Sequence, residues 1–114
     1  MWRDRAALAI VSVCAAIAVA AAQAAAAADV KAGRQKALQC QTCHGLDGLA
    51  KLPDAPNLAG QNEIYLAKTL KDYRSGVRQH EMMSLVSRNL KDEDIADLAA
   101  YYAAIPVTVG AAPR

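Results

Sequence analysis

Two cysteines three positions apart, with a histidine directly after them, constrain this chain more than any other feature of its sequence. They form the segment Cys40-Gln41-Thr42-Cys43-His44. Two thiols on one helical turn can bond to the two vinyl groups on one edge of a porphyrin, and the adjacent imidazole then lies beneath the iron. The segment therefore predicts one covalently bound haem c, with Cys40 and Cys43 as thioether residues and His44 as an axial iron ligand.

Other chemistries that use C-x-x-C lack their remaining parts in this sequence. A thioredoxin-like redox disulfide accompanies alternating strand and helix patterns, which are absent here. A zinc site needs two further ligands, and only His44, His80 and scattered carboxylates are present. Haem attachment is therefore the favoured interpretation.

The second axial ligand must come from farther along the chain. Met82 and Met83 are the candidate sulfur ligands, because Met1 belongs to the predicted signal peptide. A lone methionine is more often core filler than a ligand, but after a haem motif ligation is the better hypothesis. His80 stays an alternative, since a second imidazole would also saturate the iron and would lower its potential.

The N-terminal segment has the pattern of an export signal. Arg3 and Arg5 precede an apolar run over residues 6–22, and an alanine-rich stretch follows up to residue 28. This predicts a cleaved signal peptide over residues 1–28, with cleavage between about 24 and 28, and a periplasmic mature protein. A retained membrane anchor is the alternative, because the run approaches the ~20 residues that span a bilayer.

The predicted mature chain is one small domain. The full chain has 13 basic and 11 acidic groups, and these are nearly balanced once Arg3, Asp4 and Arg5 of the predicted signal peptide are left out. The mature chain therefore lacks the excess of basic residues that is typical of nucleic-acid-binding proteins. A chain of about 86 residues is a size at which a cofactor commonly helps to fill the core. We expect a domain over 29–106 and a C-terminal tail over 107–114.

Apolar residues at helical spacing, with no strand or hairpin pattern, predict an all-α fold. Three main helices are expected, from about residue 29 to 42, from 62 to 76 and from 92 until Pro106. Glycine and proline punctuate residues 45–60, which indicates an ordered loop of a length that usually wraps something.

Four segments together resemble the class I c-type cytochromes, and in particular the small bacterial periplasmic branch that includes the tandem di-haem cytochromes. They are CQTCHGLDG at 40–48, PNLAGQ at 56–61, YRSGVR at 73–78 and DEDIADLAAYY at 92–102. The resemblance covers nearly all of residues 29–106 and implies a cytochrome c fold wrapped around one haem. With a single C-x-x-C-H motif, the chain corresponds to one domain of the tandem proteins, and any second haem would belong to a partner.

The resemblance also implies roles for individual residues. Pro56 matches the proline whose carbonyl accepts the proton of the proximal imidazole, and Leu58 matches a side chain that packs on the haem. The family's ligand methionine stands seven positions before the leucine that opens the last helix, here Leu90, which selects Met83 and leaves Met82 as the fallback. Gly33 and Tyr101 match the crossing of the first and last helices.

With both axial positions filled by protein, the iron has no site for oxygen or peroxide, so electron transfer is the expected function and an enzyme is not. The expected partners are redox proteins, such as a donor dehydrogenase and an acceptor oxidase, with no nucleic acid and no membrane after signal cleavage; a monomer is favoured. Two alternatives stay open. One is a cytochrome subunit of a dehydrogenase or terminal oxidase complex, and the other is a haem peroxidase or gas sensor.

Overall fold

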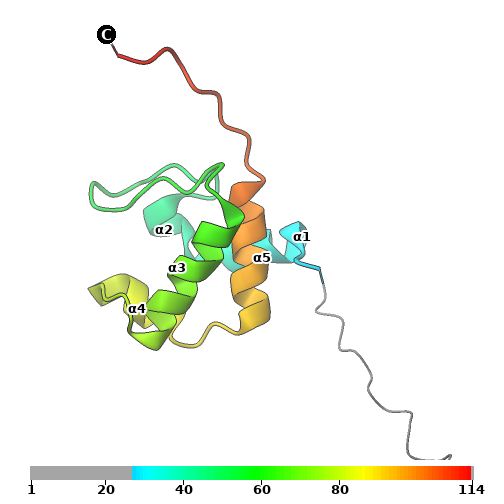
Figure 1. Ribbon diagram of the computed structural model, residues 1–114, viewed down its shortest axis with the longest axis vertical. Helices are drawn as coiled ribbons and strands as arrows, with labels where there is room; N and C mark the ends of the chain where they lie inside the picture. The colour runs from blue at the N-terminus through cyan, green and yellow to red at the C-terminus, as the bar shows by residue number, and fades with distance from the viewer. Residues whose placement is uncertain (1–26, 114) are drawn as a thin grey trace, which may run out of the picture.

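The described part of the chain, residues 27–113 of a computed structural model, is built from helices and loops and contains no strand (Figure 1). The helices are α1 Val30–Lys36, the 3-10 helix η1 Ala37–Gln39, α2 Gln41–His44, α3 Glu63–Ser75, α4 Glu81–Ser87 and α5 Asp92–Ala103. The expected all-α fold with three main helices is confirmed. The predicted signal peptide lies almost wholly outside the described residues. Across the part that the structure describes, no helix is both long and apolar enough to cross a bilayer.

The first predicted helix is interrupted, which corrects the expectation of one helix from residue 29 to 42. Asp29 caps α1, with its side chain accepting the backbone N–H groups of Lys31 and Ala32. After Lys36 the chain tightens into η1, and the N–H of Cys40 bonds to the carbonyl of Ala37 at 2.9 Å. This i to i−3 turn separates α2, which carries the motif, from α1. Helical periodicity does not distinguish such a turn from continuous helix.

The second helix, α3, begins and ends where its capping residues predict. Asn62 accepts a hydrogen bond from the N–H of Tyr65 at 2.9 Å. At the other end, Gly76 takes a left-handed conformation with φ of 82°, which favours glycine. Leu66 is the buried residue of the helix and contributes to the core, which also contains Ala37, Leu98, Ala99 and Tyr102.

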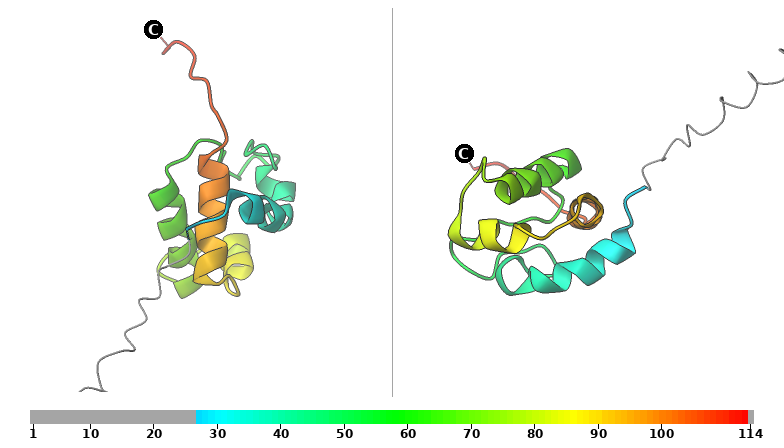
Figure 2. Two further views of the ribbon diagram at one scale, coloured as in Figure 1. Left: turned by 90° about the vertical axis from the view of Figure 1, so that its right-hand side faces the viewer. Right: turned by 90° about the horizontal axis from the view of Figure 1, so that it is seen from below.

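Helices α1 and α5 cross at close range, and Gly33 makes the approach possible (Figures 1 and 2). A Cβ atom on Gly33 would lie 2.0 Å from the carbonyl oxygen of Asp97 and 2.8 Å from the Cβ of Tyr101. Only glycine fits between these two backbones. The expected crossing of the first and last helices at Gly33 and Tyr101 is therefore confirmed.

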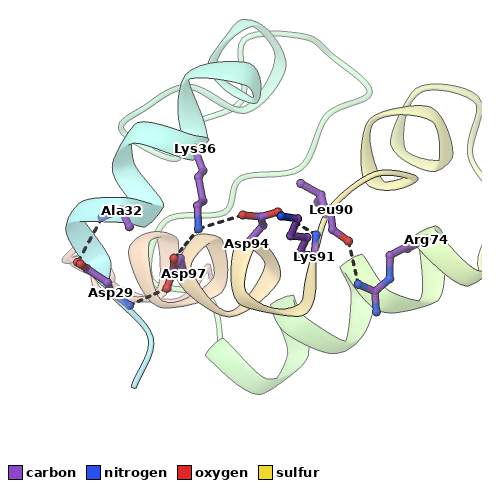
Figure 3. A network of polar contacts seen from close by, with 8 residues as sticks. All are labelled: Asp29, Ala32, Lys36, Arg74, Leu90, Lys91, Asp94 and Asp97. Carbon is purple, nitrogen blue, oxygen red and sulfur yellow. Dashed lines mark hydrogen bonds and ion pairs between the residues drawn. The ribbon is translucent and has the colours of Figure 1, made fainter. Parts of the chain in front are cut away.

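A polar network fixes the same crossing (Figure 3). Asp97 is 3 % exposed, and its carboxylate accepts the N–H of Asp29 at 2.7 Å and the Nζ of Lys36 at 2.6 Å. Lys36 also pairs with Asp94 at 3.0 Å. The hydrogen bond from Lys36, followed by that from the Asp29 backbone, lowers the pKa of Asp97. The first described turn of the chain is thus tied to the middle of α5.

This network predicts a specific acid sensitivity. A carboxyl with a lowered pKa stabilises the fold above its unfolded-state pKa of about 3.9, and the contribution is lost as pH falls through the folded-state value. We expect Asp97→Asn to cost about 2 kcal/mol at pH 7, because hydrogen bonds to charged groups are lost. We also expect the variant to show a shallower loss of stability below pH 4 than the wild type.

Chemical denaturation between pH 2.5 and pH 7 measures both effects. Asp54→Asn, an exposed substitution in loop 45–60, is the matched control and should follow the wild-type curve. Equal pH dependence in the wild type and Asp97→Asn would contradict the proposed role of the network.

Candidate functional site

Helix α2 presents the two thiols and the imidazole together. Cys40 is its N-cap residue, and Cys43 and His44 form its last turn. The N–H of His44 bonds to the carbonyl of Cys40 at 3.0 Å, which closes one helical turn between the first thiol and the imidazole. Both cysteines are half-buried free thiols. The local fold therefore places two reactive sulfurs and a ring nitrogen on one short element.

The acidity of Cys40 bears on the redox-disulfide alternative. Burial, with a smaller contribution from the neighbouring Cys43, raises the pKa of the Cys40 thiol to about 11. Redox-active C-x-x-C cysteines have a lowered thiol pKa, because the thiolate is the nucleophile. The environment of Cys40 is thus the opposite of the one that thiol exchange requires.

The imidazole of His44 is held in one orientation. It is 6 % exposed, and its Nδ1 lies 2.9 Å from the carbonyl oxygen of Pro56. A carbonyl only accepts hydrogen bonds, so Nδ1 carries the proton and Nε2 keeps a lone pair. Such a contact fixes the tautomer and the ring plane of a metal-ligating histidine. The structure thus brings together His44 and Pro56, the pair that the resemblance indicates.

The loop over residues 45–60 places Pro56 by pairing its own two limbs. The carbonyl of Gly48 accepts the N–H of Leu58 at 2.8 Å, and the N–H of Ala50 bonds to Asn57 at 2.7 Å. Gly48 has φ of 71°, and a Cβ there would lie 2.5 Å from the backbone nitrogen of Ala59. Leu58 is half-buried and packs against the core.

Two tyrosines of α5 contact the backbone just after His44, and the sequence did not reveal them as site residues. The hydroxyl of Tyr102 donates to the carbonyl of Gly45 at 3.1 Å, and that of Tyr101 donates to the carbonyl of Leu46 at 2.6 Å. Their separation from the loop in sequence is large, so no local pattern signals the contact. The adjacent pair of tyrosines near the end of an apolar helix was the only available hint.

The candidate second ligands lie on and before α4, which stands with α2 on one side of the α3 and α5 pair (Figures 1 and 2). Met83 is half-buried and Met82 is 50 % exposed, both in the first turn of α4. His80 is the N-cap residue, and its Nδ1 accepts the N–H of Met83 at 3.3 Å. The three residues lie on one turn, but they differ in burial and in hydrogen bonding: Met83 is the more buried methionine, Met82 is more exposed, and His80 caps the helix.

The residues present fit a haem c group. Two free thiols on one turn suit the porphyrin vinyl groups, and the Nε2 of His44 has a lone pair for iron. Leu49 and Leu52 of loop 45–60 are large apolar side chains that are 51 % and 43 % exposed, so they are available to pack on an apolar disc. Within the described residues, no cluster of three or more histidine, cysteine, aspartate or glutamate side chains could hold a metal ion by itself.

Comparison with known families decides the assignment. A match to the family described as cytochrome c spans residues 30–104. The chain belongs to the cytochrome c family. Members of this family carry covalently bound haem c on a C-x-x-C-H motif, which this cytochrome has at residues 40–44.

Individual relatives indicate the branch of the cytochromes c. Cytochrome c4 of Pseudomonas aeruginosa is 46 % identical over 84 residues, which cover 74 % of this chain and 42 % of that protein. Cytochrome c-554(548) of Halomonas halodenitrificans is 46 % identical over 77 residues, covering 65 % of this chain and 93 % of the relative. The crystal structure of reduced cytochrome c4 from Pseudomonas stutzeri superposes with a TM-score of 0.68 at 38 % identity, over 76 % of this chain and 50 % of that one.

The chain thus spans about half the length of the cytochromes c4 that it matches and nearly all of the Halomonas cytochrome. This agrees with the expectation that it corresponds to one domain of a tandem cytochrome. The relatives named above are bacterial proteins.

Proposed function

We propose that this cytochrome carries single electrons between redox proteins through an iron held by His44 and Met83. The observation that carries the proposal is that Nδ1 donates a hydrogen bond in His44 and accepts one in His80. In His44, Nδ1 donates to Pro56 and Nε2 is free to bind iron. In His80, Nδ1 accepts the N–H of Met83, so the proton is on Nε2 and no lone pair remains for a metal.

The orientation of α4 favours Met83 over Met82. Residues four apart share a helix face, so Met83 lies on the face of Ser87, which is fully buried. Met82 is 50 % exposed and lies on a more exposed side of the helix with Leu85, which is 55 % exposed. The greater burial of Met83, together with its position seven residues before Leu90, supports Met83 as the iron ligand.

The protein's contribution is to hold two axial donors, orient one of them and exclude water. The haem, when bound, supplies the Fe(III)/Fe(II) couple, and histidine with methionine ligation raises its potential. Pro56 fixes the imidazole plane of His44, and Leu58 with the apolar loop side chains would pack on the haem. With both axial positions occupied, electron transfer requires no bond to form or break at the metal.

Optical spectra of the holoprotein test this ligation. We expect low-spin haem with a weak near-infrared band from the methionine to iron bond, and we expect the band to disappear in Met83→Ala. Met82→Ala, the adjacent methionine on the exposed face of α4, is the matched control and should keep the band. Loss of the band in Met82→Ala alone would reverse the assignment, and a wild type that is high-spin would contradict the electron carrier with two protein ligands.

We further propose that the protein is exported and works in the periplasm after cleavage of residues 1–28. The basic start and alanine-rich end of this segment support processing by a signal peptidase. The intact mass of the holoprotein purified from the periplasm gives the cleaved bond directly. A mass that retains the full apolar run would favour the membrane anchor instead.

The second candidate function is that of a cytochrome subunit bound to one dehydrogenase. A Stutzerimonas stutzeri protein named thiosulfate dehydrogenase electron acceptor is 38 % identical over 71 residues, which cover 61 % of this chain and 33 % of that protein. A thiosulfate dehydrogenase structure from Marichromatium purpuratum superposes with a TM-score of 0.64 at 35 % identity, over 74 % of this chain and 20 % of that one. These relatives support a dehydrogenase as the electron donor, and stable co-purification with one would favour a subunit over a free carrier.

A further inference from the structure

The last turn of α5 contacts both limbs of the loop that orients His44. On the first limb, the hydroxyls of Tyr102 and Tyr101 donate to the carbonyls of Gly45 and Leu46. On the second limb, the N–H of Gly60 donates to the backbone carbonyl of Tyr102 at 3.0 Å. The loop over residues 45–60 therefore begins and ends on the same turn of one helix.

The tyrosine hydroxyls are well-defined anchors. The two rings pack edge to face, with centroids 5.1 Å apart, and Tyr102 is 3 % exposed. Burial raises the pKa of Tyr102, so its hydroxyl stays a donor throughout the physiological range. Tyr101 is held from the other side by the close approach of Gly33 to its Cβ. Both donors thus belong to rings that pack in or against the core.

Gly45 links these anchors to the imidazole. It directly follows His44, with φ of 70° and ψ of 151°, a backbone conformation that favours glycine. Its N–H bonds to the carbonyl of Gln41, and its carbonyl also accepts the N–H of Gly48 at 3.2 Å. Gly45 is therefore held through its N–H by Gln41 and through its carbonyl by Gly48 and by Tyr102 of α5.

We propose that Tyr101 and Tyr102 are positioning residues for the proximal imidazole, acting through the carbonyls of Gly45 and Leu46. The proposal rests on His44 being an axial ligand. The hydroxyls fix where the loop leaves α2, and the loop in turn carries the Pro56 carbonyl to Nδ1. A hydrogen bond to Nδ1 raises the basicity of the imidazole and so favours Fe(III). Loosening the loop weakens that bond and raises the reduction potential.

The variants Tyr101→Phe, Tyr102→Phe and the double variant test the proposal, because each removes a hydroxyl and keeps the ring. Tyr73→Phe is the matched control, since the Tyr73 ring lies on α3 against Arg78 and His80 and contacts neither loop limb. We measure the reduction potential, the haem-methyl proton shifts of the ferric protein, which report the orientation of the imidazole plane, and the unfolding temperature.

We expect both tyrosine variants to raise the potential and move the haem-methyl shifts, with the largest change in the double variant and none in Tyr73→Phe. A lower unfolding temperature with unchanged potential and shifts would show a merely structural role and overturn the proposal. Should the double variant not fold, either single variant decides the question. Failure of the proposed function would appear separately, as a wild-type spectrum without histidine and methionine ligation.

Discussion

Gly33→Val is expected to destabilise the protein by about 3 kcal/mol or more, because overpacking at a rigid contact forces the backbone to move. The atoms in the way are the carbonyl of Asp97, 2.0 Å from a built Cβ, and the Cβ of Tyr101. Neither belongs to the free end of a flexible side chain, so α1 and α5 must separate. Separation would also stretch the contacts of Asp97 with Asp29 and Lys36. Denaturant unfolding of the holoprotein measures the loss.

Ala32→Val provides the control for this prediction. Ala32 is the adjacent residue of the same helix and is only half-buried. The substitution adds the same β-branched side chain and costs only the difference in helix propensity, about 0.5 kcal/mol. Similar losses in the two variants would show that the crossing tolerates a side chain and that the packing argument is wrong.

His44→Ala is expected to abolish low-spin haem. The substitution removes the ring nitrogen that Pro56 orients and opens space at a position that is 6 % exposed in the wild type. Residues that only support a metal ligand typically matter ~10–100-fold for binding, so loss of the ligand itself should lower the low-spin fraction by at least tenfold. Haem stays attached through the thioethers, and the optical spectrum of the purified protein reads the change directly.

His80→Ala is the matched control among the histidines. It removes the N-cap of α4, which is worth about 1 kcal/mol, and leaves the iron ligands in place. We expect a low-spin spectrum with a slightly lower unfolding temperature. A low-spin spectrum retained in His44→Ala but lost in His80→Ala would exchange the roles of the two histidines.

Much of the fold followed from residues that act locally. Asn62 and Gly76 fixed the ends of α3 because a side-chain acceptor and a left-handed glycine are properties of single positions. The break between α1 and α2 did not follow, because η1 has no such marker and depends on where Ala37 is buried against other helices. Periodicity gives the face of a helix but not a change in its hydrogen-bond register.

The site residues also differ in whether a local sequence pattern indicates them. Cys40, Cys43 and His44 could be predicted because their chemistry requires a fixed spacing within one turn. The contact of Pro56 with Nδ1 of His44 was implied only by the family resemblance, and the structure shows it. The hydroxyls of Tyr101 and Tyr102 were missed, because their acceptors are backbone carbonyls more than fifty residues away. Every residue has a backbone carbonyl, so the sequence does not indicate which one accepts a hydrogen bond from a distant side chain.

The crossing of α1 with α5 joins parts of the chain that are far apart in sequence. Its contact between Asp29 and Asp97 joins residues 68 positions apart, so the chain must close a long loop before the crossing gains any energy. Until α5 has been synthesised, α1 has no partner for its glycine face. The thiols at 40 and 43 share one local turn, and Cys40 also packs against the core to which α5 contributes. The motif that would hold the haem is therefore local in sequence, whereas the crossing that closes the domain is formed only when the two ends of the chain meet.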